Sequence, residues 1–230
     1  MTRVALLDAK PLGENCYTFG GLDFLSDKFA STLSECGIRE GDAVTVILDP
    51  SAALAVAVLG ILKRGAVAVL LSPALDFSEI EDAINDSPAR AIVAPFAERE
   101  TYAAIAHRHS ITIVFLAGDS SEAIHYEGAE HSFWRDVFLA SSDFTPAAMP
   151  DSATAFIFTV KTAEATLRRI IHTHAAILEQ LAQINQQAEH MPDADHALWC
   201  GEDWSSSDVF LGRVFSTWWS GGAVTIGPKR

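Results

Sequence analysis

Hydrophobic and polar residues are arranged in blocks along this chain of 230 residues. Some blocks have the spacing of an amphipathic helix, and others have the pattern of a strand. After Tyr17, leucines and phenylalanines recur every three or four residues until a break at Gly37, which is the spacing of an amphipathic helix. Two short blocks, 43–48 and 66–71, are apolar almost throughout, as in strands covered on both faces. Residues 52–63 lie between them, are apolar nearly all round, and predict a buried helix.

The same rhythm continues to the last residues. It predicts further helices at 76–85, 97–107 and 175–189, a last helix bearing Phe210 to Trp219, and strands at 90–94, 111–116, 196–200 and 223–226. Strands that alternate with helices of this length favour an α/β fold with a doubly wound, mostly parallel sheet and helices on both faces. We expect one domain over 1–230, with a weakly patterned segment at about 118–152 crossing between two layers.

The stretch from Ala153 to His174 combines a short apolar run, a polar segment and the start of a helical pattern. A strand, a turn of small polar residues and a helix start are the parts of many phosphate-binding loops. No glycine lies between Ser152 and Gly201, however. Without glycine, the turn lacks a residue that adopts positive φ at low cost or brings the backbone close to a phosphate. The stretch therefore has the frame of a nucleotide loop without its chemistry.

This stretch resembles the signature of the adenylate-forming superfamily, which includes acyl-CoA synthetases, luciferases and the adenylation domains of peptide synthetases. In that family an apolar strand enters a Thr-Ser-Gly-Thr-Thr-Gly-x-Pro-Lys-Gly loop, which is followed by Val-x-His-(Thr/Ser)-His. Residues 156–159 are similar to the strand, and residues 170–174 (IIHTH) are similar to the exit.

The loop between them departs from the pattern. Counting back from His172 places Arg168 at the loop lysine, and counting forward from Phe158 places Thr159 and Thr162 on family threonines. The two counts differ by one residue, and every family glycine is replaced. The resemblance implies that Thr159, Thr162 and Arg168 occupy degenerate phosphate-loop positions.

Two further segments carry the resemblance. Residues 17–48 resemble the opening Tyr-Thr helix of the family, and Trp199, Cys200 and Asp203 match the Trp-Cys-x-x-Asp segment of acetyl-CoA and medium-chain acyl-CoA synthetases. The resemblance implies the N-terminal domain of such an enzyme, truncated before the adenine and ribose contacts, the hinge and the C-terminal lid with its catalytic lysine. It also implies His172, Trp199, Asp203 and Trp204 as candidates for a substrate pocket.

Adenylation builds charge on phosphate oxygens, so a catalyst supplies close backbone N–H groups, a lysine and Mg²⁺. Loss of one such preorganised donor typically raises the barrier by about 3 kcal/mol. Because several are replaced together, we expect no catalytic residue and no cofactor here, with ATP and Mg²⁺ bound only if the loop still functions. No metal site is expected, since neither the His107/His109 pair nor His172 with His174 has a third ligand at metal-binding spacing.

The composition of the chain indicates which classes of binding partner to expect. A net charge of −14 argues against a nucleic-acid surface. An apolar content of 49% suggests elements buried on two faces, or a surface that another domain or subunit covers. The three dispersed cysteines favour reduced thiols, and the N-terminal residues have no apolar signal core, so we expect a cytoplasmic protein. The longest apolar run, 52–62, is too short to span a membrane.

Three functions follow as hypotheses. The first is a truncated, degenerate acyl-CoA synthetase-like protein that binds rather than catalyses, as a homo-oligomer or as the accessory subunit of a second protein. The second is the N-terminal fragment of an active ATP-dependent acyl- or aryl-CoA ligase. The third is a binder of acyl or aromatic small molecules, with a pocket built from Trp199, Trp204 and the apolar face at 210–219.

Overall fold

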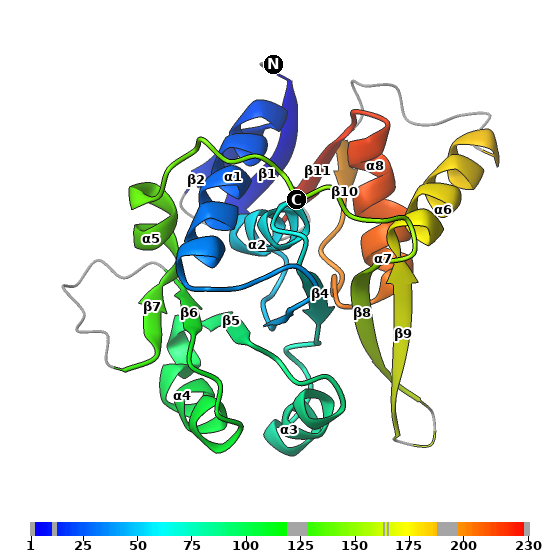
Figure 1. Cartoon of the computed structure of the whole chain (residues 1–230). Coiled ribbons are helices and arrows are strands. Elements are labelled where there is room, and N and C mark those ends of the chain that lie inside the picture. The colour runs from blue at the N-terminus through cyan, green and yellow to red at the C-terminus, as the bar shows by residue number, and fades with distance from the viewer. Residues whose placement is uncertain are drawn as a thin grey trace.

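Two β-sheets and the helices around them make up the computed structural model, which describes residues 3–10, 13–118, 128–162, 164, 166–187 and 197–227. The larger sheet has seven strands in the order β7-β6-β5-β3-β4-β8-β9, and only the β8–β9 pair is antiparallel (Figure 1). Its strands are β3 (Ala43–Val46), β4 (Val67–Leu70), β5 (Ala91–Pro95), β6 (Val114–Ala117), β7 (Glu130–Ser132), β8 (Thr154–Lys161) and β9 (Leu167–Thr173). The predicted α/β class with a mostly parallel sheet is confirmed.

Both faces of this sheet are covered, because successive residues of each central strand point to opposite sides. On one face Val44, Val46 and Leu70 join the main core, and on the other Ile47 and Val69 join a second core. Helices α3 (Phe77–Asp86) and α4 (Arg99–Arg108) cover the second core, and α4 follows the 3₁₀ turn η1 (Phe96–Glu98). Helices α1 (Phe19–Glu35), α2 (Ala52–Lys63) and α5 (Phe133–Leu139) cover the main core.

The smaller sheet joins the two ends of the chain. Its order is β10-β11-β1-β2, with β1 (Val4–Lys10) parallel to β11 (Ala223–Ile226) and antiparallel to β2 (Gly13–Thr18). Strand β10 (Ala197–Trp199) lies at its edge beside β11. Residues of β1 and β11 belong to the same core as residues of α2 and the larger sheet, so the two sheets share one interior.

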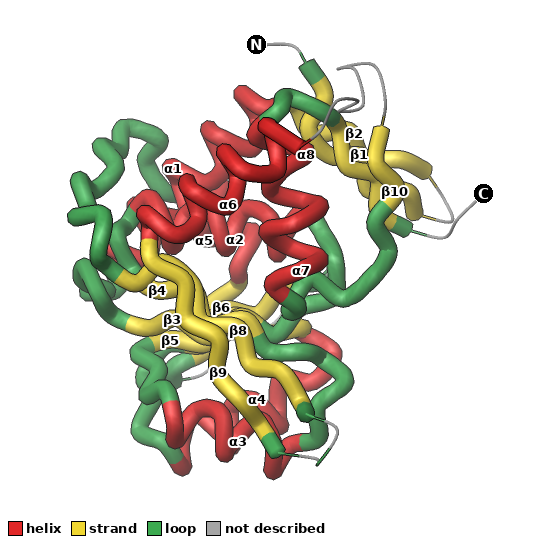
Figure 2. The backbone as a smooth tube through the Cα atoms, turned by 90° about the vertical axis from the view of Figure 1, so that its right-hand side faces the viewer, coloured by secondary structure: helices red, strands yellow, loops and turns green. Residues whose placement is uncertain are grey.

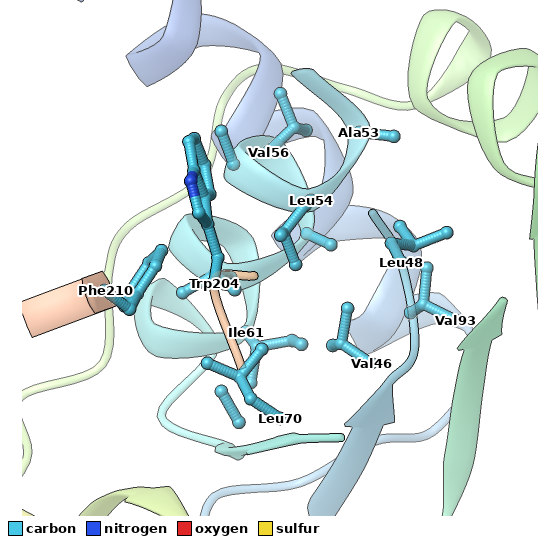
Figure 3. Packing of buried hydrophobic residues seen from close by; sticks show 14 of the residues in the cluster. Val46, Leu48, Ala53, Leu54, Val56, Ile61, Leu70, Val93, Trp204 and Phe210 are labelled. Carbon is cyan, nitrogen blue, oxygen red and sulfur yellow. The ribbon is translucent and has the colours of Figure 1, made fainter. Parts of the chain in front are cut away.

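A C-terminal helical segment packs between the sheets. It consists of α7 (Ser207–Val209), a π-helical turn η2 (Phe210–Phe215) and α8 (Ser216–Trp219), and α6 (His174–Gln187) packs beside it (Figure 2). Figure 3 shows Trp204 next to Phe210 and directed at residues of α2. These buried aromatic rings fill the space between α2, β8 and the C-terminal helix.

Several predicted elements need correction. The N-terminal strands β1 and β2 were not predicted, and Thr18 is the N-cap of α1 rather than part of its apolar stripe. The weakly patterned crossover segment at about 118–152 contains β7 and α5, which were not predicted, and its residues 119–127 lie outside the described part of the chain. The seven-residue strand β9 between the polar turn and α6 was also not predicted.

Candidate functional site

The residues expected to form the phosphate loop lie on an antiparallel hairpin. Strand β8 runs beside β4 at the end of the parallel series and turns back through 162–166 into β9. In its register Thr159 is opposite Arg169, and Val160 is opposite Arg168. The turn extends past the carboxyl end of β8, which is where ligands bind in open α/β sheets. The hairpin therefore occupies the expected place for a nucleotide loop.

The described residues of the turn are hydrogen-bonded to one another. The Thr162 N–H donates to the Thr166 carbonyl oxygen at 2.8 Å, and the two hydroxyl oxygens lie 2.8 Å apart. The Thr166 N–H donates to the Thr162 Oγ1 at 3.3 Å. These contacts close the turn on itself. Two backbone N–H groups that an open phosphate loop would direct at a ligand have partners inside the turn.

Two cations of the hairpin are tied to helix α3. The Lys161 ammonium forms an ion pair with Glu79, which raises the pKa of Lys161. The Arg169 guanidinium donates to the carbonyl oxygen of Asp86 and to the Ser87 Oγ at the C-terminal end of α3. A cation at that position is favourable, because the last carbonyl groups of a helix carry partial negative charge.

Arg168 points to the other face of the hairpin, since neighbouring strand residues alternate. On that face its strand neighbours are Ile170, which packs against the main core, and His172. The Arg168 side chain is exposed. Of the three predicted loop residues, Thr159 is 95% buried within the sheet, and Thr162 closes the turn. Arg168 is the cationic residue of these three.

Asp203 joins this edge from a distant part of the sequence. Its Oδ2 accepts a hydrogen bond from the Ser72 hydroxyl, and its Oδ1 accepts one from the Ser205 N–H at 2.8 Å. Ser72 follows the carboxyl end of β4, the strand next to β8. The Trp-Cys-x-x-Asp segment is therefore fixed beside the hairpin. Ser72 was not predicted, because a serine after an apolar strand carries no signal of a partner 131 residues away.

His172 lies on β9, and its ring packs against Phe158 of β8. Its ring meets the Phe158 ring edge to face at 5.6 Å, and its Nε2 is buried without a hydrogen-bond partner among the described residues. Burial lowers the pKa of His172, and the Asp208 carboxylate opposes that shift. His174, at the start of α6, also has a buried Nε2 without such a partner, and burial lowers its pKa against the effect of Asp151. Both rings are therefore suited to the neutral form.

The two tryptophans predicted for a substrate pocket lie elsewhere. Trp204 is fully buried and packs against Phe210 and Trp218 at ring separations of 5.8 and 5.9 Å. Trp199 lies on the edge strand β10 and donates its indole N–H to the Gly227 carbonyl oxygen at 3.0 Å. Thr159, Thr162, Arg168 and His172 lie along the hairpin, on both of its faces, and Asp203 is bonded to Ser72 beyond the end of the neighbouring strand β4.

A cavity of about 480 Å³ lies in another part of the molecule, between α1, α2 and the C-terminal helical segment. His172, Trp199, Asp203 and Trp204 do not line it. Its walls include Phe215, Trp218 and Trp219 from the predicted apolar face.

Among the described residues, no three or more His, Cys, Asp or Glu side chains are grouped as metal ligands would be. No helix in the same part of the chain has the length and apolarity to cross a bilayer.

Comparison with known proteins agrees with this architecture. The sequence profile of a family described as "AMP-binding enzyme" matches residues 1–226. Acetyl-coenzyme A synthetase from Chlorobaculum tepidum is 25% identical over 194 residues, which cover 79% of this chain and 29% of that protein. Surfactin synthase subunit 2 from Bacillus subtilis is 36% identical over 77 residues, or 34% of this chain and 2% of that protein.

Solved structures show the same fold. ATP-bound MatB from Rhodopseudomonas palustris superposes with a TM-score of 0.85 at 19% identity, covering 100% of this chain and 43% of MatB. The N-terminal domain of FACL13 from Mycobacterium tuberculosis, solved with an inhibitor bound, gives a TM-score of 0.82 at 18% identity over 100% of this chain and 54% of that one. The chain thus spans less than half of MatB and under a third of the acetyl-coenzyme A synthetase. It belongs to the AMP-binding enzyme family, the adenylate-forming family that its motifs resemble, and corresponds to the N-terminal part of its members.

Proposed function

We propose that this chain is a degenerate acyl-CoA synthetase-like protein that does not adenylate by itself and acts as a binding or accessory subunit. The closed β8–β9 turn is the observation that supports this most directly. Thr162 and Thr166 use each other's backbone and hydroxyl groups, so the described part of the turn offers few donors to a phosphate. ATP with Mg²⁺ fits this arrangement poorly.

The cations of the hairpin support the same proposal. A phosphate site needs positive charge that is free to face the ligand. Lys161 is paired with Glu79, and Arg169 is held by the end of α3. Moving Lys161 toward a phosphate would leave Glu79 without its ion-pair partner, and moving Arg169 would break its hydrogen bonds to Asp86 and Ser87. Arg168 remains as a planar cation on the opposite face, which can attract a phosphate but cannot surround it.

Exposed apolar side chains support a role in assembly. Phe138 and Leu139 at the end of α5 are 64% and 74% exposed, and Ile171 on the edge strand β9 is 57% exposed. Large apolar side chains at the surface are typical of regions that another protein covers. The proposed partner is a second copy of this chain or a different subunit.

Calorimetry with Mg·ATP tests the catalytic half of the proposal. We expect no heat beyond dilution at millimolar nucleotide and no exchange of labelled pyrophosphate into ATP, with MatB as the positive control. Arg168→Ala and Arg169→Ala provide a matched pair at adjacent positions. Saturable binding of ATP that Arg168→Ala abolishes and Arg169→Ala preserves would overturn the proposal, because the hairpin would then hold a nucleotide.

Sedimentation velocity tests the other half. We expect self-association in the micromolar range, or a complex when the chain is purified with a bound partner. A chain that stays monomeric at 100 μM (a concentration about tenfold above a 10 μM Kd) and is isolated without a partner would contradict an accessory role.

A second candidate function is one half of a split ligase. It is favoured by the coverage of relatives, because the chain matches only 43% of MatB and 29% of the acetyl-coenzyme A synthetase. In this case a second polypeptide would supply the remaining contacts to the nucleotide. The test is pyrophosphate exchange after mixing with the rest of the Chlorobaculum enzyme, produced separately. Exchange above that of either part alone would favour this candidate over the first.

A further inference from the structure

We propose that the cavity between α1, α2 and α8 is a binding site for a small organic cation with an aromatic or other apolar body. The cavity has a volume of about 480 Å³, which is within the range of small-molecule sites. Its lining comes from Phe19 to Ser26 on α1, from Leu59 and Lys63 on α2, and from Phe215, Trp218 and Trp219. This site shares no residue with the β8–β9 hairpin, so the inference stands independently of the proposed function.

The walls are mainly aromatic. Phe19, Phe215, Trp218 and Trp219 bring four rings to the cavity. The Trp218 ring is fixed in place, because its indole N–H donates to the Ala5 carbonyl oxygen at 2.9 Å, and Phe215 packs edge to face against it at 6.4 Å. The Trp219 ring is 55% exposed and stands at the rim. Aromatic faces attract both apolar groups and cations, most strongly when the cation is partly desolvated.

Lys63 is the one basic residue of the lining, and its hydrogen-bond donors already have acceptors within the protein. The Lys63 ammonium has three N–H donors. They are directed at the Asp23 carbonyl oxygen at 2.9 Å, the Asp23 Oδ1 at 2.6 Å and the Asp27 Oδ1 at 2.6 Å. No donor of Lys63 is left for a ligand. An anionic ligand such as a carboxylic acid would therefore have to displace a carboxylate of the protein.

Two of the first N–H groups of α1 are already hydrogen-bonded within the protein and are not available to an anion. The Gly21 N–H donates to the Thr18 Oγ1 at 3.0 Å, and the Phe19 N–H donates to the Arg3 carbonyl oxygen at 3.0 Å. Both are satisfied within the protein.

The net charge around Lys63 favours the binding of a cationic ligand. Two carboxylates surround one ammonium, which leaves a net charge of −1 at this end of the cavity. The Asp23 side chain lines the cavity and is 71% exposed, so one of its oxygens can face a ligand while the other holds Lys63. A ligand that places an ammonium group near Asp23 and its apolar body between the rings satisfies both parts of the site.

The start of α1 and the end of α8, which line this site, lie at the end of the molecule opposite the tip of the hairpin (Figures 1 and 2). Acids are the substrates that the family's names describe, as in acetyl-coenzyme A synthetase. A preference for amines would distinguish this site from an acyl pocket.

Three ligands of one shape test the charge preference: 3-phenylpropylammonium, 3-phenylpropanol and 3-phenylpropionate. Titration of each into the intact chain, followed by calorimetry and tryptophan fluorescence, gives their affinities. We expect the ammonium to bind about tenfold or more tightly than the alcohol, and the acid to bind most weakly, because the ion pair and cation–π terms act only on the cation. Equal affinities, tighter binding of the acid, or no binding of any of the three would overturn the proposal.

Variants identify the residues responsible. Asp23→Asn should reduce the preference for ammonium over alcohol to within about threefold, since Lys63 then neutralises the remaining carboxylate. Asp82→Asn, on the exposed face of α3, is the matched control and should leave the preference unchanged. Because Asp23→Asn also alters Lys63, Trp219→Ala is needed as a second variant and should weaken binding of the ammonium about fivefold or more without lowering stability. Unchanged affinity in both variants would place the ligand elsewhere.

Discussion

At the residue scale, two cations of the hairpin are held by contacts with helix α3. Lys161 and Arg169 lie on a strand pair at the edge of the sheet where a phosphate would bind, and both side chains extend to α3. Glu79, the partner of Lys161 on α3, also completes the capping box with Asp76. The pattern Asp-x-x-Glu before an apolar run is a signal of a helix start. The sequence thus contained the position of Glu79, but not its ion pair.

The first prediction concerns Gly65, which ends α2 with φ of +74°. A Cβ at this position would lie 2.7 Å from the Met149 Sδ and 2.9 Å from the Ala147 Cβ. Gly41 has a similar φ of +79° and open space around its Cβ direction. Gly41→Ala should cost about 1–2 kcal/mol of unfolding free energy, from the backbone alone. Gly65→Ala should cost about 1–3 kcal/mol more, because the 147–149 segment must move.

Urea denaturation of the two variants measures this difference. Equal costs for Gly41→Ala and Gly65→Ala would show that the 147–149 segment yields without loss and does not constrain Gly65.

The second prediction concerns the dependence of stability on pH. Burial lowers the pKa of His172 and of His174 below the ordinary value of 6.5, and the facing carboxylates of Asp208 and Asp151 reduce both shifts. Below pH 6.5 the unfolded chain takes up protons that the folded chain does not, so the free energy of unfolding falls with pH from 6.5 toward the folded pKa values. Above about pH 7 this contribution to the pH dependence is absent.

A series of urea melts between pH 5 and pH 8 (a range of about 1.5 units on each side of the ordinary histidine pKa) measures the slope. The double variant His172→Gln/His174→Gln should have a shallower slope than the parent chain. His107→Gln, which removes an exposed imidazole on α4, controls for the loss of a histidine. A slope that the double variant leaves unchanged would mean that other groups determine the pH dependence.

At the element scale, the clearest predictions came from elements whose apolar pattern and end signals agree. Helix α2 begins and ends at the predicted residues, since Ser51 caps its first turn and Gly65 follows its last. Strand β9 was missed because its sequence, LRRIIHT, alternates poorly and contains two arginines. It is a strand because β8 offers it a full antiparallel ladder from Thr154 to Lys161. Pairing with a neighbouring strand, rather than the local sequence pattern, therefore determines the secondary structure of these residues.

The third prediction concerns the start of α1. Thr18 has extended backbone geometry, and its hydroxyl accepts a hydrogen bond from the Gly21 N–H at 3.0 Å. Thr18→Ala should lower the free energy of unfolding by about 1 kcal/mol, because one N–H of the first turn loses its acceptor. Thr18→Ser keeps the hydroxyl and should retain most of this stability. Thermal melts compare the three chains, and a serine variant as unstable as the alanine variant would assign the loss to the methyl group instead of the cap.

At the scale of the whole molecule, the N-terminal and C-terminal strands share one core. Leu6 on β1 is fully buried and lies opposite Val224 on β11. Both belong to the same cluster as Leu54 on α2 and Leu70 on β4. The smaller sheet and the larger sheet should therefore unfold together as one cooperative unit.

The fourth prediction tests this cooperativity with Leu6→Ala. Four of the five tryptophans lie between 199 and 219, so their fluorescence reports on the C-terminal region, whereas far-UV circular dichroism reports on all elements. The substitution should cost about 2–5 kcal/mol, and it should shift the urea midpoints of both signals equally. Val137→Ala, a buried position on α5, is a control in the other half of the core. A midpoint that moves for fluorescence alone would separate the smaller sheet as an independent unit.

The sequence by itself determined the elements whose periodicity is local and the class of fold that follows from their alternation. It also established that the turn at 162–166 contains no glycine, and no tertiary contact can change that. Tertiary structure alone decided the pairing of β1 with β11, the strand β9, and the hydrogen bond from Ser72 to Asp203. Each of these joins a segment to a partner that its own residues do not specify. Their energy comes from burial and hydrogen bonds that exist only once the chain has folded.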